Sequence, residues 1–387
     1  MNRSTAVLSL FSLLFAMLAG CARERATPLI IGKTEIVQSK LLDLDVELKI
    51  FVPESYSSGE QKYPVLYIVQ SDFLHASGIA SWLSRVNSIP ELIVVSLETY
   101  RSGDFTPLPI EGEPGTGGAD KFIGFFKEEL FPFIDARYPT KSYRIFYSGS
   151  WGGAFGVYAM LAQPDVFNAC LTASPWIDYE GQSNFIEENA SSLLKKAQFR
   201  NRFLYMAAEN DQMLLPVLAR FQKIMQSDAP PGLEWEYHPF ADEDHSSIPH
   251  KTIYAGLTAL FHPWRTAPPE ATENGVKGLL EYKEVLSRKY GCDIGLSYTT
   301  LLSAGSKFLR EKAYGRAREI FQLCVESYPD REFAYLKLAE AFEGSGQLAE
   351  AVDVYQKAHH LAARKKSPHV HVFKGELERV RKRVSEQ

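Results

Sequence analysis

The chain has 387 residues, of which 45% are hydrophobic and 12% aromatic, and its formal net charge is −5. A chain of this length and composition can bury one large core, and we expect two cores of unequal size. The acidic balance gives no basic surface for nucleic acid, so we expect no nucleic-acid partner.

The N-terminal residues have the pattern of an export signal. Arg3 supplies a positive charge, and the apolar run Val7–Leu18 is too short to cross a bilayer, for which a helix needs about 20 apolar residues. The run ends in Leu18-Ala-Gly-Cys21, which resembles the lipobox at which bacterial lipoproteins are cleaved and lipidated. We therefore predict a signal peptide over residues 1–20 and a lipid on Cys21 that anchors the protein to the membrane.

The residue after the lipobox cysteine is Ala22 and not Asp, which by resemblance to the usual sorting pattern favours the outer membrane, facing the periplasm. An ordinary secretory peptide is the alternative, but it leaves Cys21 an unexplained thiol. Residues 21–43 are predicted to hold the lipid-anchored segment and a first strand region. The other cysteines suggest no disulfide framework, and we expect Cys170 and Cys324 to be core residues.

Residues 44–265 alternate short β-rich apolar runs with amphipathic stretches. This pattern is typical of a mostly parallel sheet with helices on both faces. The clearest predicted helix is Asp120–Tyr138, whereas five glycines and three prolines in residues 101–118 predict a loop without regular structure that could cover a pocket. The predicted strands are Val46–Val52, Val65–Gln70, Leu92–Leu97, Tyr143–Tyr147, Cys170–Ala173, Phe203–Ala207 and Glu234–Tyr237.

Pro263 to Pro269 marks a domain boundary, after which helical sequence dominates. We interpret residues 266–295 as a helical linker and residues 296–387 as a small all-α domain. Within it an offset of 34 residues, the tetratricopeptide period, aligns four pairs of positions. An unrelated helical hairpin with chance spacing is the alternative. Two repeats are few for a free-standing array, so Leu279–Tyr290 and His371–Val384 are predicted to cap the stack, which could bind a protein partner. The aligned pairs are Phe308 with Phe342, Ala317 with Ala351, Phe321 with Tyr355, and Gln322 with Gln356.

The strongest chemical signal is Phe146-Tyr-Ser-Gly-Ser-Trp-Gly-Gly-Ala154, in which a strand passes into a helix through a turn of small residues. Such a nucleophile elbow places a serine in strained backbone and needs small residues two positions before and after it. Gly152 meets this need, whereas Ser148 replaces the usual glycine. We predict that Ser150 is the nucleophile.

A serine nucleophile needs a base, and a carboxylate to orient that base. His245 lies in a loop after the last predicted strand and is favoured over His250, its close rival. Hydrolases of this class order the triad as serine, acid, histidine, which directs the search to residues 208–212. We favour Asp211 as the acid because it lies a few residues beyond the predicted strand end, and Glu209 is the alternative.

Negative charge that develops on the substrate carbonyl oxygen needs two donors. The backbone amide of Trp151, at the start of the helix after the nucleophile, is predicted to be one. The backbone amide of Asp72, in the loop after Val65–Gln70, is predicted to be the other.

Taken together, these residues resemble the putative-esterase family, which includes esterase D and enzymes that cleave ferric enterobactin. The resemblance implies an α/β-hydrolase fold and ester hydrolysis, and some members carry tetratricopeptide-like tails. The chain departs from the family at Gln70-Ser71, where relatives often have Asp-Gly, and at Trp176, where the usual serine is absent. The motifs are Tyr63-Pro-Val-Leu-Tyr-Ile, Ile93-Val-Val-Ser96, Arg101, Asp104-Phe-Thr-Pro107, Gly117-Gly-Ala-Asp-Lys-Phe122, Ser150-Trp-Gly-Gly153, Ser174-Pro175 and His245-Ser246.

Two further residues are candidates for substrate binding. Trp176 lies in a stretch expected to line the acyl or alcohol pocket. Arg101 could meet an anionic substrate such as a siderophore chelate, although an arginine three residues from Asp104 more often braces its own loop. No His, Cys and Asp cluster has metal-ligand spacing and no glycine-rich phosphate loop is present, so we expect neither a metal nor another cofactor.

The sequence therefore predicts a serine carboxylic-ester hydrolase that forms an acyl-enzyme and acts on a siderophore-like or other small periplasmic ester. One alternative is a membrane-tethered interaction scaffold that uses the helical repeats. The other is an acyltransferase with the same triad, in which an alcohol replaces water as the acceptor.

Overall fold

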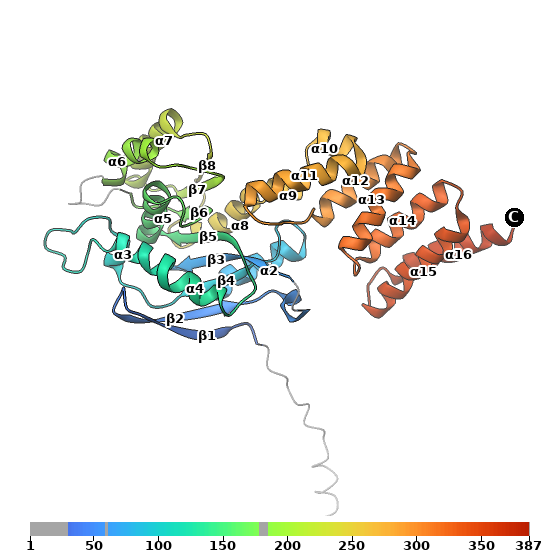
Figure 1. The fold of residues 1–387 in the computed structure, drawn as a ribbon, viewed down its shortest axis with the longest axis horizontal. Coiled ribbons are helices and arrows are strands. Elements are labelled where there is room, and N and C mark those ends of the chain that lie inside the picture. Colours follow the sequence, from blue (N-terminus) through green and yellow to red (C-terminus); the bar gives the residue numbers. More distant parts are fainter. Residues whose placement is uncertain (1–29, 59–60, 178–184, 387) are drawn as a thin grey trace, which may run out of the picture. The chain divides into compact units, whose positions relative to one another are not determined.

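The computed structural model describes residues 30–58, 61–177 and 185–386, shown as a coloured ribbon in Figure 1. All the elements below belong to the compact unit Lys33–Gln387. The predicted signal peptide and Cys21 lie outside the described residues. Among the helices that are described, none is long and apolar enough to cross a membrane.

An eight-stranded sheet forms the centre of the hydrolase part, in the order β1-β2-β4-β3-β5-β6-β7-β8. β2 pairs antiparallel with β1 and β4, and the other neighbouring pairs are parallel. This confirms the predicted α/β-hydrolase fold with a mostly parallel sheet. The strands are β1 (Lys33–Ser39), β2 (Leu44–Phe51), β3 (Tyr63–Val69), β4 (Ile93–Leu97), β5 (Thr140–Gly149), β6 (Ala169–Ala173), β7 (Arg202–Glu209) and β8 (Leu233–Phe240).

Helices cover both faces of the sheet (Figure 1). β3, β4 and β6 are buried at every position, because a sheet covered on both faces has no solvent side. One face packs against α3, α4, α5, α6 and α7, and the other packs against α2 and α8. These helices are α2 (Phe73–Arg85), α3 (Ala119–Gly124), α4 (Phe131–Asp135), α5 (Ser150–Ala162), α6 (Phe185–Lys196), α7 (Leu214–Asp228) and α8 (Ile248–Leu260).

The predicted helix over residues 120–138 is present, but it contains a π-helical stretch, η3 (Phe125–Leu130), between α3 and α4. Pro132 has no N–H to donate to the carbonyl four residues before it, which favours a local change of helical pitch. A small difference also occurs in the glycine-rich loop, which contains the 3₁₀ turn η2 (Ser102–Phe105). The Arg101 backbone N–H donates to Asp104 Oδ2 at 2.9 Å and closes this turn. Another 3₁₀ turn, η1 (Glu54–Ser58), precedes β3.

Eight helices of the described chain follow α8, coloured from yellow through orange to red in Figure 1. α14 begins 34 residues after α12, and α15 begins 34 residues after α13. This spacing agrees with the period found in the sequence, while the tetratricopeptide identity of the repeat stays a prediction. The helices are α9 (His262–Arg265), α10 (Pro269–Glu273), α11 (Gly275–Tyr290), α12 (Tyr298–Arg310), α13 (Tyr314–Ser327), α14 (Glu332–Gly344), α15 (Leu348–Arg364) and α16 (Val370–Ser385).

One apolar core runs from the sheet into these helices. The cluster contains Ile145 of β5, Leu257 of α8, Leu286 of α11 and Phe308 of α12. A hydrogen bond also joins the two parts: Tyr290 of α11 donates its hydroxyl proton to the Leu260 carbonyl of α8 at 3.0 Å. The hydrolase part and the first helices of the tail therefore share a single hydrophobic core across residue 265.

Two of the cysteines behave as the sequence predicts. Cys170 in β6 and Cys324 in α13 are buried free thiols. Burial raises the pKa of the Cys324 thiol to about 12, and it also raises the pKa of Cys170. Both are therefore protonated, unreactive core residues at neutral pH.

Candidate active site

Ser150 occupies the strained turn that the sequence predicts. It is the first residue of α5, directly after β5, and its φ is +53°. A non-glycine residue in this region costs about 1–3 kcal/mol, so surrounding structure must hold it there. The turn raises the serine at the carboxyl edge of the sheet, where parallel strands present functional groups.

The neighbours of Ser150 explain how the turn tolerates a serine at position 148. A Cβ atom on Gly152 would lie 2.1 Å from Ser148 Oγ, so glycine is required at 152. The Ser148 hydroxyl donates to the Val69 carbonyl of β3 at 2.8 Å. This hydrogen bond satisfies a buried polar group, and the departure from the usual glycine does not disturb the elbow.

Glu209 and His245 contact each other near the carboxyl edge of the sheet. Glu209 is the last residue of β7, and its side chain is 7% exposed. Its Oε1 lies 2.8 Å from Nδ1 of His245, which comes from the loop between β8 and α8 and is 58% exposed. The Ser174 hydroxyl, at the end of β6, donates to the other carboxylate oxygen of Glu209.

The geometry does not support the preference for Asp211 as the acid. Asp211 Oδ1 accepts hydrogen bonds from the backbone amides of Met213 at 2.8 Å and Leu214 at 2.9 Å, so it caps the start of α7. The predicted strand ended at Ala207, whereas β7 continues to Glu209 through pairing with β8. This extension places Glu209, the alternative acid, at the sheet edge.

The order of the strands brings the three candidate residues to one edge. β5 carries Ser150, and β7 carries Glu209 two strands away, a separation of about 10 Å at the usual inter-strand spacing. The imidazole bound to Glu209 through Nδ1 has Nε2 left to accept a proton. The described residues include no hydrogen bond between Ser150 and His245; such bonds are often long before substrate binds. His250, the rival base, instead faces His75, with 2.9 Å between Nδ1 and Nε2.

The oxyanion loop differs from the prediction. Asp72 caps α2, because its carboxylate accepts the His75 amide at 2.7 Å, and it does not line the cavity beside Ser150. Gln70 lines that cavity instead, with a φ of +51°, and its Oε1 accepts the Gly152 amide at 2.9 Å. Sequence reasoning missed the Gln70 side chain, although its departure from the family pattern was a signal. Trp151 also lines the cavity and follows Ser150 in α5, as the prediction of its amide as a donor requires.

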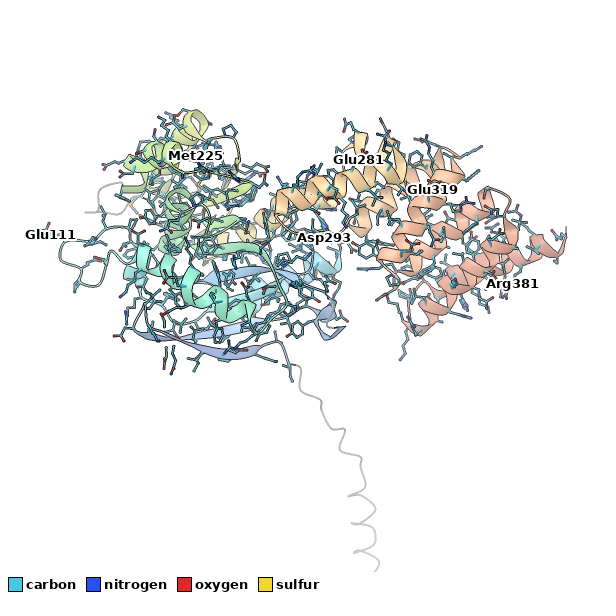
Figure 2. The ribbon with its side chains drawn as sticks, viewed as in Figure 1. Glu111, Met225, Glu281, Asp293, Glu319 and Arg381 are labelled. Carbon is cyan, nitrogen blue, oxygen red and sulfur yellow. The ribbon has the colours of Figure 1, made fainter. Side chains whose placement is uncertain are left out.

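A cavity of ≈ 680 Å³ opens beside the nucleophile. One wall is Ser150, Trp151 and Gln70, and the other is the glycine-rich loop through residues 101–103 and 112–116. Figure 2 labels Glu111 at the outer end of this loop. The prediction that the loop covers a pocket agrees with this arrangement.

Arg101 and Trp176 differ in their relation to the cavity. Arg101 lines it, but its guanidinium donates to the backbone carbonyls of Leu42 at 2.9 Å and Asp43 at 3.1 Å. The arginine therefore braces the loop against the β1–β2 turn through its guanidinium. Trp176 is half-buried and does not line the cavity; its amide donates to the Ser150 carbonyl at 3.2 Å.

No group of three or more His, Cys, Asp and Glu side chains is arranged to hold a metal within the described ranges.

The fold and the strained serine at its sheet edge define an α/β-hydrolase. Residues 39–224 match the family described as Putative esterase. The hydrolase part of this chain is therefore similar to the proteins of that family.

Three curated relatives are siderophore esterases by name. The chain is 26% identical over 194 residues to the siderophore enterobactin esterase of Emericella nidulans, covering 43% of this chain and 63% of that protein. It is 24% identical over 250 residues to the siderophore triacetylfusarinine C esterase of Aspergillus fumigatus, covering 54% and 86%. It is 26% identical over 244 residues to the ferri-bacillibactin esterase BesA of Bacillus subtilis, covering 52% and 80%. The chain thus spans under two thirds of the first relative's length.

Solved structures share the fold. An IroE-like serine hydrolase from Shewanella oneidensis superposes with a TM-score of 0.65 at 23% identity, covering 76% of this chain and 99% of that one. A protein from Capnocytophaga ochracea superposes with a TM-score of 0.61 at 18% identity, covering 85% and 93%. Because the second match covers more than the hydrolase part, the likeness in fold extends into the helical tail.

Proposed function

We propose that the protein is a serine carboxylic-ester hydrolase that forms an acyl-enzyme, with Ser150 as nucleophile, His245 as general base and Glu209 as its orienting acid. The observation that supports this most is the contact between Glu209 and His245 at the sheet edge that carries the strained Ser150. A serine hydroxyl alone is a weak nucleophile, and an oriented imidazole supplies the base it lacks.

The proposed reaction has two steps. Ser150 Oγ attacks the ester carbonyl while Nε2 of His245 takes the hydroxyl proton, and the Trp151 amide donates to the oxyanion. The imidazolium then protonates the leaving alcohol, which departs and leaves an acyl group on Ser150. Water enters, gives a proton to His245 and attacks the acyl carbon, which releases the acid and restores the serine. Glu209 keeps Nδ1 protonated throughout and stabilises the imidazolium.

The proposed substrate class is a siderophore-like ester. The names of the three relatives support it, as does a cavity of ≈ 680 Å³, which is large enough for a sizeable organic ligand. Arg101 adds a positive charge to the cavity wall, which favours an anionic substrate. The acyltransferase and scaffold alternatives have no observation of their own in their favour.

The test compares wild type with Ser150→Ala. We expect wild type to hydrolyse short nitrophenyl esters and a ferric catecholate ester, and to react covalently with a fluorophosphonate probe. Ser150→Ala should lose both properties with unchanged circular dichroism, while Ser227→Ala, an exposed serine on α7, should keep them. Labelling that persists in Ser150→Ala would refute the assignment of the nucleophile.

We also propose that the protein is lipid-anchored in a bacterial cell envelope, at the outer membrane and facing the periplasm. The lipobox-like Leu18-Ala-Gly-Cys21 supports this. Replacing Cys21 by Ala should release the protein from the membrane fraction and leave its esterase turnover intact. Equal membrane retention of both forms would contradict the anchor.

A further inference from the structure

A hollow of ≈ 290 Å³ lies on the helical tail, away from the cavity beside Ser150 in sequence and in its lining residues. Its walls come from the turn between α13 and α14, from α14 and from α15. Lys357, His360 and Arg364 are spaced by three and four positions on α15, so they share one helix face. The complete lining is Pro329, Tyr335, Lys357, His360, Leu361 and Arg364.

The lining carries positive charge and no acidic side chain. Lys357, His360 and Arg364 make no ion pair or hydrogen bond through their side chains with other residues in the described part of the tail, and all three are exposed. Asp330, beside Pro329, and Asp353, one turn before Lys357 on α15, are the acidic residues that flank the hollow. Neither forms an ion pair with its cations.

Several cations near the hollow have side-chain partners. Lys365 pairs with Glu332 at 3.5 Å, and Lys337 pairs with Glu340 at 2.7 Å. On α16, Arg381, labelled in Figure 2, donates to Gln356 at 2.8 Å. Among the described residues, Lys365, Lys337 and Arg381 thus have side-chain partners, whereas Lys357, His360 and Arg364 form no ion pair or side-chain hydrogen bond.

The whole tail also carries an excess of positive charge. Residues 296–387 hold 16 Lys and Arg against 12 Asp and Glu, although the full chain has 42 against 47. The tail is therefore positive within an acidic protein. Complementary charge on a partner speeds encounter and fixes its orientation on such a surface.

The apolar part of the lining indicates what kind of anion fits. Tyr335, Leu361 and Pro329 give the hollow apolar walls beside its cations. An inorganic anion would use the cations alone, whereas a peptide that alternates acidic and apolar side chains would use both. Stacked helical hairpins commonly provide such extended binding surfaces.

We propose that this hollow binds an acidic segment of a partner protein, with Lys357 and Arg364 contacting its carboxylates and Tyr335 contacting an apolar side chain. The site is separate from Ser150, so binding and ester hydrolysis can be measured independently.

The experiment uses the purified full chain and fluorescence anisotropy of a labelled peptide of about ten residues that alternates Glu or Asp with Leu and Phe. The double variant Lys357→Glu/Arg364→Glu should weaken binding by about tenfold or more. The matched control Arg310→Glu/Lys374→Glu changes the charge of the tail equally at exposed positions outside the hollow, and should stay within about twofold of wild type.

Three comparisons decide the outcome. The same peptide with Gln and Asn in place of its acids should not bind, and neither inorganic phosphate nor vesicles containing phosphatidylglycerol should compete with the acidic peptide at matched charge. Absence of acidic-peptide binding to wild type, equal loss in both double variants, or preferential binding to vesicles would overturn the proposal. Unchanged helical circular dichroism and unchanged esterase turnover in both variants show that the chain is folded.

Discussion

Glu209 Oε1 lies 2.8 Å from His245 Nδ1, although the two residues come from different strand ends and are 36 positions apart. The nearly buried carboxylate also accepts a hydrogen bond from Ser174, whereas the imidazole is largely exposed. A carboxylate held by Ser174 thus contacts an imidazole that solvent can reach. The proposed serine-hydrolase mechanism requires such an oriented and accessible imidazole.

We expect Glu209→Gln to lower kcat by on the order of 10³- to 10⁴-fold, because the amide no longer stabilises the imidazolium or fixes its tautomer. Asp211→Asn is the matched control, since the amide oxygen can still cap α7. Its turnover should stay within about twofold of wild type. Steady-state kinetics on a nitrophenyl ester measure kcat for both variants. A larger loss of kcat in Asp211→Asn than in Glu209→Gln would indicate that Asp211 is the acid.

Ser174 is a positioning residue that acts through Glu209. Its hydroxyl donates to the Glu209 carboxylate, and its φ of +46° makes its backbone unusual as well. We expect Ser174→Ala to lower kcat by about tenfold with little change in KM, since a hydrogen bond to a charged group contributes about 1.5–3 kcal/mol. Ser174→Gly also deletes the hydroxyl but relieves the backbone. If Ser174→Gly retained full kcat, the lower kcat of Ser174→Ala would be caused by backbone strain and not by loss of the hydroxyl.

Gly152 tolerates no side chain in the present packing. A Cβ there would lie 2.1 Å from Ser148 Oγ and 2.8 Å from Gln70 Oε1. We expect Gly152→Ala to lower the free energy of unfolding by about 1–3 kcal/mol and to reduce turnover by displacing the elbow. The added substitution Ser148→Gly removes the clashing Oγ atom. It should restore part of the stability and part of the turnover that Gly152→Ala loses. Denaturant titration and kinetics of the single and double variants test this, and strictly additive losses would contradict the steric explanation.

The pairing of His75 with His250 makes stability depend on pH. Burial, and then the charge of His250, lowers the pKa of His75 in the folded state, against a smaller opposing effect of Asp72. The unfolded chain therefore binds this proton first as pH falls, so the free energy of unfolding should decrease as pH drops below about 6.5. His75→Gln should flatten this slope, and His262→Gln, an exposed histidine on α9, should not. Parallel slopes for wild type and His75→Gln in chemical denaturation would exclude the pair as the cause.

Glu343 ties three helices of the tail together. It accepts hydrogen bonds from Arg379 at 2.6 Å and Tyr355 at 3.1 Å, and those with Arg379 hold the pKa of its carboxyl below the usual range. Its stabilising effect is thus complete above the unfolded pKa near 4.5 and is lost as pH falls below it. We expect Glu343→Gln to destabilise the tail by about 1–3 kcal/mol at neutral pH. Thermal unfolding followed by circular dichroism measures this, with Glu378→Gln as an exposed control on α16.

The sheet and the elbow could be predicted from the sequence because both depend on local patterns. Strands such as β3 and β4 are buried at every position, so they appear as unbroken apolar runs. The turn at Ser150 requires small residues at fixed offsets, and Gly152 is visible in the sequence.

The choice between Asp211 and Glu209 and the contacts of the proposed oxyanion loop could not be predicted in the same way, since both depend on contacts between distant residues. The end of β7 is set by pairing of Glu209 with Phe240 of β8, and this pairing separates Glu209 from Asp211. Gln70 acts on an amide 82 positions later in the chain. Such contacts cannot be recognised from a local sequence pattern.

The apolar core that crosses residue 265 connects the helical tail to the helix that follows His245. α8 begins three residues after His245, and its Leu257 belongs to the same cluster as Phe308 of α12 and Phe321 of α13. A chain cut after residue 265 would expose the apolar surface on which these helices pack, while α8 would keep its contacts with the sheet and α2. We therefore expect a displacement of the first tail helices to reach α8, and with it the segment that carries the His245 imidazole, through these packed side chains.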